Sequence, residues 1–588
     1  MSRKQRLELT WIGKDAAPKL EPRVLIFDTT QSYYSSSPRN PEEFFENMLI
    51  YGDNLLALKA IQSDFSEKIK LIYIDPPFNT GAALDFYDDG IEHSIWLNLM
   101  YMRLKIIHSL LREDGCIFIH IDDNEIDYLK IILDEVFGRQ NFINRITVDA
   151  RSPSAFSTVN PGVFKASEYI LWYAKSKELF SENSLRIPRS PDYAYNKYIE
   201  NIDDPFEDWR MVSALEAYQR GQKARGRHPR SILEHFNRWM IDNAERLCRL
   251  ASISDIGASS EIVELKKKSI RNAGKIFRLE RSGGLDDVYV LDGQQMIFYG
   301  KNVAVIDGQR TASALLTNIW TDIAWEGISG EGGVQFKKGK KPERLIRRCL
   351  ELASDVGDWV LDSFAGSGTT GAVAHKMGRR WIMVELGEHC HTHIIPRMRR
   401  VVDGTDATGI TEAVGWKGGG GFRYYRLAPS LIERDQWGQP VISPAYNAAM
   451  LAEAMCKLMG FRYEPSADVF WQQGRSSERD FIYTTTRTLT HEELAAISAQ
   501  VGDDRTLLIC CKAFRMARPD ALPNLTVKKI PNAVLAKCEW GKDDYSLNVA
   551  NLPMAAPVEE PPAPARPKRR NRTPDLFDQA TAEEEPGA

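Results

Sequence analysis

The sequence lacks three patterns that would assign it early to a class of protein. None of its eight cysteines forms a CxxC pair, so neither a disulfide framework nor a common zinc motif is indicated, and we expect reduced thiols. No apolar run approaches 18 residues and the first residues lack the apolar stretch of a signal peptide, so we expect a cytoplasmic protein without a membrane span. The formal net charge of −4 gives no global sign of a polyanion partner, so any site for one must be a local basic patch.

The pattern of strands and helices divides the chain into segments. At 588 residues the chain is too long for one core. Expected strands and helices alternate over residues 46–150 and again over 316–426, which predicts a largely parallel α/β sheet covered by helices. Residues 151–315 lose this rhythm and mix aromatic residues with basic runs. We also expect an N-terminal extension (1–45), a small C-terminal α/β domain (427–551) and a disordered tail rich in proline, alanine and charge (552–588).

A glycine-rich loop follows the expected strand at residues 359–364. Gly366, Gly368 and Gly371 form a G-x-G-x-x-G pattern between a strand and a helix, and Glu385 ends the next expected strand. Glycines allow a ligand to approach the backbone closely, and the helix N-terminus offers free N–H groups to an anion. That anion could be the pyrophosphate of a dinucleotide or a carboxylate, so an NAD-dependent oxidoreductase is a competing interpretation.

The stretch Asp75-Pro76-Pro77-Phe78 ends an expected buried strand with a carboxylate, two rigid prolines and an aromatic ring. The exocyclic amino group of a nucleobase is a poor nucleophile, because its lone pair is delocalised into the ring. The Asp75 carboxylate and the Pro76 carbonyl can accept its two hydrogens and turn the lone pair out of the ring plane. The prolines fix the backbone and remove competing N–H donors, and Phe78 offers a face on which a flipped base can stack. The stretch therefore indicates methylation of a base amino group; a strand followed by an incidental proline turn is the alternative.

These two motifs together carry a resemblance to a known family. Asp362-Ser-Phe364-Ala-Gly366-Ser-Gly368-Thr369 is similar to the D-P-F-x-G-S-G-T loop of amino-methylating DNA methyltransferases, with Ser363 in place of the usual proline. The chain resembles the β class of these enzymes, and most closely the modification subunits of Type III restriction–modification systems. The resemblance implies an α/β fold with a Rossmann-like sheet dependent on S-adenosylmethionine (SAM), in circularly permuted motif order. It also implies an inserted target-recognition domain and a small C-terminal α/β domain.

The resemblance also implies roles for individual residues. Asp53 would contact the adenine of SAM, Glu385 would hold its ribose hydroxyls, and Phe364 would pack on it. Ser367, Thr369 and Thr370 would meet its methionine carboxylate at the helix N-terminus. The other cofactor residues would be Lys341, Pro342, Asp362, Gly366 and Gly368, and the catalytic residues Asp75, Pro76, Pro77 and Phe78, where Phe78 replaces the more common tyrosine.

No metal is expected, because methyl transfer from a sulfonium needs none. The cluster His389, Cys390, His391 and His393 fits no common zinc spacing.

Substrate and partners follow from the same resemblance. Aspartate at the first catalytic position is more typical of adenine enzymes, which favours N6-adenine in double-stranded DNA. A cytosine-N4 methyltransferase and a catalytically silent DNA-binding subunit are alternatives. The family implies DNA recognition by residues 151–315, a homodimer, and a separate helicase–nuclease subunit. Within the basic run 220–230, the candidate phosphate contacts are Lys223, Arg225, Arg227 and Arg230; a solvated helix face is the other interpretation.

Overall fold

The computed structural model describes residues 8–15, 18–36, 43–79, 93–151, 163–221, 229–283, 285–336, 339–515 and 522–545. Within these ranges no helix is long and apolar enough to cross a membrane. The chain divides into two compact units after Leu547. The second unit, which includes the tail predicted at 552–588, lies outside the described residues.

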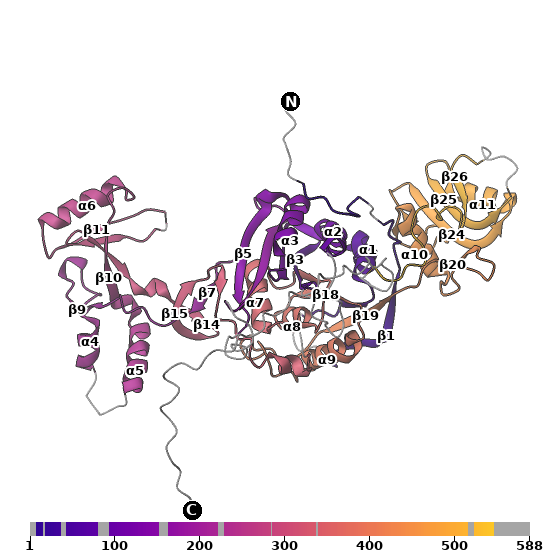
Figure 1. Ribbon diagram of the computed structural model, residues 1–588. Helices are drawn as coiled ribbons and strands as arrows, with labels where there is room; N and C mark the ends of the chain where they lie inside the picture. Colours follow the sequence, from indigo (N-terminus) through magenta and orange to yellow (C-terminus); the bar gives the residue numbers. More distant parts are fainter. Residues whose placement is uncertain are drawn as a thin grey trace, which may run out of the picture. The chain divides into compact units, whose positions relative to one another are not determined.

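The largest sheet in the described part of the chain has ten strands, in the order β1-β19-β2-β18-β17-β3-β4-β6-β5-β16 (Figure 1). Six consecutive strands of this sheet are parallel. These are β19 (Gly421–Leu427), β2 (Asn47–Tyr51), β18 (Arg380–Glu385), β17 (Trp359–Asp362), β3 (Ile69–Ile74) and β4 (Leu111–Ile121). Because parallel strands share a direction, their carboxyl ends lie along one edge of the sheet.

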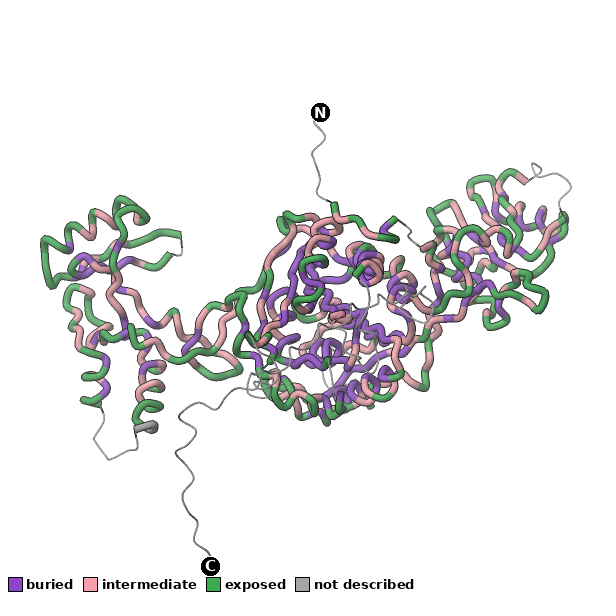
Figure 2. The backbone as a smooth tube through the Cα atoms, in the orientation of Figure 1, coloured by how far each residue is buried: buried purple, intermediate pink, exposed green. Residues whose placement is uncertain are grey.

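Both faces of this sheet are covered, because its strands are apolar on both sides. All six residues of β3 are buried. Its alternate residues enter two different core clusters: Leu71 and Tyr73 belong to one, and Ile72 and Ile74 to the other. The first cluster includes residues of α7 (Glu343–Ala353), α8 (Thr369–Lys376) and α9 (Ile395–Asp403). The second includes residues of α1 (Asn54–Phe65), α2 (His93–Leu110) and α3 (Ile126–Leu133). Figure 2 shows this burial as purple tube through the sheet. The predicted covered α/β sheet is confirmed.

The strand order also confirms the permuted arrangement. β17 and β18 lie between β2 and β3, although more than half of the chain precedes them in sequence. The loops that follow β3 and β17 are therefore neighbours in space.

The sheet extends past two predicted segment boundaries. β6 (Ser167–Ala174) lies beyond residue 150, yet it pairs antiparallel with β4 and with β5 (Phe142–Asp149). β1 (Leu25–Tyr34) comes from the predicted N-terminal extension and pairs antiparallel with β19 (Gly421–Leu427), while β16 (Ile319–Trp320) pairs with β5. The division into domains itself stays a prediction.

Between β6 and β16 the described chain forms antiparallel sheets. One has the order β11 (Ile276–Leu279), β12 (Val288–Leu291), β13 (Gln294–Phe298), β10 (Leu247–Ser252), β8 (Lys197–Ile199) and β9 (Met211–Ser213). The other has β14 (Val303–Ile306), β15 (Gln309–Leu315) and β7 (Arg186–Pro188). The helices of this region are α4 (Ala214–Gly221), α5 (Pro229–Asp242) and α6 (Ser260–Arg271).

The C-terminal part of the described chain contains the elements that its sequence predicts. Its largest sheet runs β22 (Arg462–Tyr463), β23 (Gly474–Arg475), β24 (Asp480–Leu489), β25 (Thr506–Phe514) and β26 (Leu525–Lys529). Helix α11 (His491–Val501) connects the parallel strands β24 and β25 and begins with a capping box of Thr490 and Glu493. The remaining elements are α10 (Ala448–Met459) and the hairpin of β20 (Ile432–Arg434) and β21 (Pro440–Ile442).

Candidate active site

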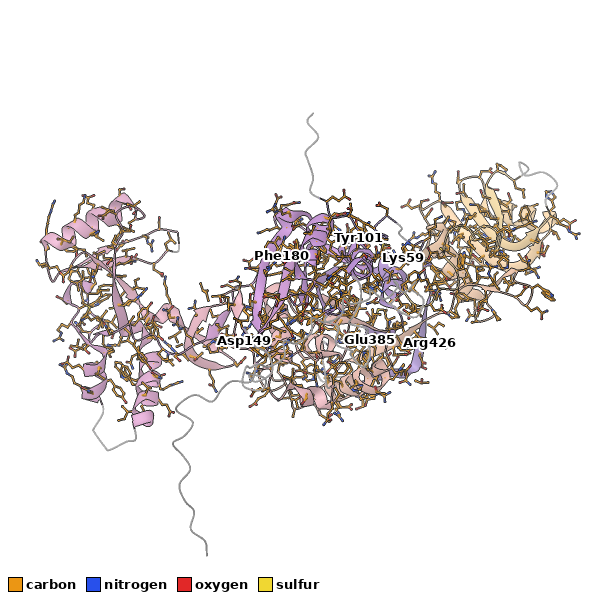
Figure 3. The ribbon with its side chains drawn as sticks, viewed as in Figure 1. Lys59, Tyr101, Asp149, Phe180, Glu385 and Arg426 are labelled. Carbon is orange, nitrogen blue, oxygen red and sulfur yellow. The ribbon has the colours of Figure 1, made fainter. Side chains whose placement is uncertain are left out.

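Four predicted segments meet at the carboxyl edge of the parallel strands. Asp53 follows β2, Glu385 ends β18, the glycine loop follows β17 and Asp75 follows β3. Ligand sites of open parallel sheets lie at this edge, where helix N-termini and loops converge. In Figure 3 Glu385 is labelled in the part of the molecule that holds this sheet.

The three glycines of the loop are required for different structural reasons: backbone conformation at two positions and close packing at the third. Gly366 and Gly368 have φ of +52° and +75°, a backbone conformation that side chains disfavour. Within the described parts of the chain, a Cβ at Gly366 would have only the Phe364 carbonyl oxygen within 4 Å, at 3.9 Å. A Cβ at Gly371 would instead meet the side chain of Met383. The third glycine therefore lets α8 pack closely on β18.

Glu385 is fixed by the loops around it. Its Oε2 accepts a hydrogen bond from the Gly366 N–H at 2.8 Å. Its Oε1 accepts from the N–H groups of Leu386 and Gly387 at 2.9 and 3.0 Å. A buried carboxylate with backbone donors on both oxygens has a defined orientation at the end of β18.

Asp362 and Thr370 join β17 to the first turn of α8. Asp362 accepts from the Phe364 N–H at 2.9 Å and from the Thr370 hydroxyl at 2.6 Å. Burial raises the pKa of Asp362 to about 7, against the lowering effect of these hydrogen bonds.

A buried arginine that the sequence did not single out supports the same loop. Arg397 of α9 donates to the Thr369 hydroxyl at 2.8 Å and to the Ser367 carbonyl at 3.1 Å. It also pairs with Glu343 at 2.8 Å. No sequence signal distinguishes Arg397 from its neighbours Arg399 and Arg400, because its partners come from loops far away in the sequence.

Asp53 has protein partners on both oxygens in this structure. Its Oδ1 caps α1 by accepting from the Leu56 N–H at 3.0 Å. Its Oδ2 accepts from the Tyr545 N–H at 2.9 Å and lies 3.4 Å from Arg103. Its predicted contact with a cofactor adenine stays a prediction.

Asp75 has one oxygen held and one free. Its Oδ2 lies 3.0 Å from Nζ of Lys341, whereas its buried Oδ1 has no hydrogen-bond partner among the described residues. Burial raises the pKa of Asp75, although Lys341 opposes the rise. The Pro77 carbonyl accepts from the Trp96 indole at 2.7 Å. Pro76, between Asp75 and Pro77 in the sequence, is buried, and its carbonyl is the predicted second acceptor.

Lys341 and Pro342 lead into α7, and Pro342 is its N-cap residue. The structure brings Lys341 to the Asp75 carboxylate and to Phe78, with Nζ 4.6 Å from the ring centroid of Phe78. The predicted cofactor contact of Lys341 is not tested by this position.

Two further residues near Asp75 were missed. The ring of His120 in β4 stacks on Phe78 with centroids 5.9 Å apart and planes at 22°, and Glu168 in β6 lies 3.6 Å from Lys341. Both are polar residues near one end of an apolar strand, and Asp75 was predicted from the same pattern. This pattern in the sequence could therefore have indicated His120 and Glu168 as well.

The predicted DNA contacts cannot be placed. Lys223, Arg225 and Arg227 lie outside the described residues, and Arg230 lies in the first turn of α5 without a described side chain. In the second basic run, at 264–282, Lys266 pairs with Asp255 at 2.9 Å and Arg278 with Asp287 at 2.7 Å. Part of that run is therefore neutralised within the protein.

The histidine cluster is dispersed over separate partners. Nε2 of His389 lies 3.1 Å from Glu385, Nε2 of His391 lies 2.8 Å from the Tyr424 hydroxyl, and Nε2 of His393 lies 3.2 Å from the Gln335 carbonyl oxygen. Among the described residues no three His, Cys, Asp or Glu side chains are grouped as metal ligands.

Comparison with known proteins assigns the chain to a family. Residues 69–395, more than half of the chain, match the family model described as DNA methylase, and the chain belongs to this family. A probable Type III restriction-modification enzyme HindVI Mod subunit from Haemophilus influenzae is 35% identical over 73% of this chain and 60% of its own length. The EcoPI Mod subunit of Escherichia phage P1 is 30% identical over 63% of this chain and 61% of its own length. The chain thus spans about three fifths of the length of these curated relatives.

Among solved structures, the cytosine-N4-specific PvuII DNA methyltransferase is 14% identical. The match covers 65% of this chain and 95% of that chain, with a TM-score of 0.30.

Proposed function

We propose that this chain is a DNA methyltransferase that transfers a methyl group from SAM to N6 of adenine in double-stranded DNA. We further propose that it is the modification subunit of a Type III-like restriction or phage-defence system. The observation that carries the reaction is the free Oδ1 of Asp75, buried beside a glycine loop at the carboxyl edge of the sheet. Membership in the DNA methylase family and the two Mod relatives support the substrate and the system.

The residues at this edge fit SAM. The room that the described residues leave at Gly366 and the N-terminus of α8 suit a ligand that carries a carboxylate. Gly366, Ser367, Gly368, Thr369 and Thr370 would hold its methionine end, with Asp362 fixing the loop and Phe364 packing on it. Glu385 would bind the ribose hydroxyls, Asp53 the adenine, and Lys341 and Pro342 would flank the methionine.

SAM would supply the methyl group as its S–C bond breaks and the amino nitrogen forms the new C–N bond. The proton that this nitrogen loses passes to the Asp75 carboxylate, its proposed hydrogen-bond acceptor, and from there to solvent. Asp75 Oδ1 and the Pro76 carbonyl accept the two amino hydrogens and orient the lone pair. Pro77 fixes the turn. Phe78 stacks the base, which must leave the helix to reach this pocket.

Adenine is favoured over cytosine by the aspartate at position 75. The partners are proposed from the resemblance of the sequence to Type III modification subunits: a second copy of the chain, and a separate helicase–nuclease subunit. DNA recognition is proposed for the region between β6 and β16, including Lys223, Arg225, Arg227 and Arg230.

Modification-sensitive long-read sequencing tests the proposal directly. Genomic DNA from methylation-free cells that express the wild-type chain should carry N6-methyladenine in one sequence motif, and an Asp75→Ala strain should not. N4-methylcytosine in the wild type would move the assignment to the cytosine class. Methylation that persists in the Asp75→Ala strain would refute the catalytic assignment.

Calorimetry separates the remaining alternatives. Wild type and Asp75→Ala should both bind SAM, because Asp75 is proposed to touch the base. Binding of NAD without SAM would favour an oxidoreductase. Binding of SAM without methylation of any DNA would favour a silent DNA-binding subunit.

A further inference from the structure

A buried charge network adjoins Asp75 and is not used by the steps above. β6 runs antiparallel to β4, so the beginning of β6, with Glu168, lies at the carboxyl edge of the parallel strands. His120 lies one residue before the end of β4. Strand direction thus brings these two buried side chains to the edge that holds Asp75.

Glu168 is the shared partner of three groups. Its Oε2 lies 2.7 Å from His120 Nε2 and 3.6 Å from Lys341 Nζ. Arg151, which follows β5, lies 3.6 Å from its other oxygen. A glutamate with so little exposure is retained in a fold only with such compensation.

Two of these partners, Lys341 and His120, contact the predicted catalytic residues Asp75 and Phe78. Lys341 holds Asp75 Oδ2 at 3.0 Å, whereas the buried Oδ1 has no hydrogen-bond partner among the described residues. His120 stacks on Phe78 and is anchored behind by the Tyr73 hydroxyl, 2.9 Å from its Nδ1. One carboxylate therefore holds both the acceptor and the stacking ring through one intermediate residue each.

We propose that Glu168 is a positioning residue for methyl transfer, which orients the Asp75 carboxylate through Lys341 and the Phe78 ring through His120. This inference rests on the proposed function and deepens it. Displacement of a reacting group by about 1 Å lowers a rate about 100-fold, so the network acts mainly on the transfer step. Because Lys341 is also proposed to flank the methionine of SAM, the effect on SAM affinity is smaller than the effect on the rate.

The charges around Asp75 give the proposal a distinctive readout. Asp75 faces Lys341 before α7, His120 in β4, Glu168 in β6, Tyr73 in β3 and Asp362 in β17. Lys341 and His120 lower the pKa of Asp75, and Glu168 raises it. Transfer needs the ionised carboxylate, so the rate falls as pH drops through the pKa of Asp75. Removal of the charge on Glu168 lowers that pKa and moves the acid limb of the pH–rate profile to lower pH.

Three variants test the proposal. Glu168→Gln is nearly isosteric and removes the charge, Glu168→Asp keeps the charge with a shorter reach, and Glu178→Gln makes the same charge change at an exposed turn after β6. Single-turnover methylation of DNA that carries the identified motif is measured from acid to neutral pH, with SAM calorimetry on each variant as the check of folding.

Glu168→Gln should lower the transfer rate on the order of 10- to 100-fold, shift the acid limb to lower pH and lower SAM affinity much less than the transfer rate. Glu168→Asp should lower the rate with the acid limb at its wild-type position, and Glu178→Gln should match wild type. If Glu168→Gln binds SAM and keeps the wild-type rate or acid limb, the positioning role is refuted while the methyltransferase stands. If both Glu168 variants lose SAM binding, Glu168 is a structural residue and the proposal fails. If the wild-type chain methylates no DNA, the proposed function itself fails.

Discussion

The Phe78 ring is predicted to supply an aromatic face for the base, a role that needs no hydroxyl group. Its centroid lies 5.9 Å from that of the His120 ring and 4.6 Å from Nζ of Lys341. Stacking of a base on an aromatic side chain contributes about 1–3 kcal/mol. We therefore expect Phe78→Ala to raise KM for DNA about tenfold to a hundredfold, and Phe78→Tyr to stay close to wild type.

Steady-state kinetics with a methylatable duplex measures this difference, and SAM calorimetry shows that both variants are folded. Wild-type KM and kcat in Phe78→Ala would refute the prediction that the base stacks on the Phe78 ring.

Asp362 should make stability depend on pH. Burial raises the pKa of Asp362 from its ordinary 3.8 to about 7. Between these values the folded chain holds a proton that the unfolded chain has lost, so stability falls as pH rises from about 4 to about 7.

Asp362→Asn mimics the neutral form and keeps a group that can bond to Thr370 and Phe364. Its Tm should therefore depend less on pH over this interval than the wild-type Tm, as measured by melting curves at fixed ionic strength. Parallel curves for the two chains would show that Asp362 is ionised in the fold.

At the residue scale, the sequence predicts those candidate site residues whose pattern lies within a few neighbouring positions. Asp75, Glu385 and the glycines follow apolar strands directly, and their chemistry is visible in a few neighbouring letters. The contacts of Arg397 and Glu168 join parts of the chain that are distant in sequence. Arg397 binds Thr369, the first residue of α8, 28 residues away, and Glu168 pairs with Lys341. Such pairings arise only when the sheet has formed.

At the element scale, the same difference separates the predicted sheet from the antiparallel ones. The central strands are continuously buried and alternate with helices, so their periodicity is strong. Strands such as β8 and β9 have only three residues each and are partly exposed. Their register is set by partners such as β10 and not by a pattern of their own, which explains why residues 151–315 looked irregular.

The contact between α8 and β18 yields an element-scale prediction. A methyl group at Gly371 would overlap the end of the Met383 side chain, and overpacking of this kind costs about 1–3 kcal/mol. Because Met383 is flexible, we expect Gly371→Ala to lie at the lower end of that range and to weaken SAM binding by displacing the loop.

Gly257→Ala is the matched control, since a Cβ there would have no described atom within 4 Å. Thermal melting and SAM calorimetry compare the two variants with wild type. Equal Tm and SAM affinity in all three would mean that α8 does not need glycine at this contact.

At the scale of the whole molecule, the chain leaves the large sheet after β6 and returns at β16. These two strands lie outside the parallel strands that carry the site. The intervening region can therefore change in sequence without altering strand order at the catalytic edge, which is the arrangement that a variable recognition region requires.

The C-terminal segment 539–545 connects parts of the chain that are far apart in sequence. The Glu539 N–H donates to the Lys19 carbonyl at 2.9 Å, and the buried Arg23 donates to Asp543 and to the Lys542 carbonyl at 2.7 and 3.0 Å. The Tyr545 N–H donates to Asp53 at 2.9 Å. Loss of a partner from a buried polar group costs about 1–3 kcal/mol.

A chain that ends at Cys538 should therefore melt several degrees below a chain that ends at Tyr545, because Arg23 and Asp53 keep their burial and lose these partners. Asp543→Ala, in which the exposed carboxylate alone is removed, should cost less than about 1 kcal/mol. Melting curves of the three proteins under one condition make the comparison. Equal Tm for the two truncated chains would show that the contacts of residues 539–545 add nothing to the stability of the sheet. If Asp543→Ala lowered the Tm as much as the truncation at Cys538, the whole effect would belong to the ion pair of Asp543 with Arg23.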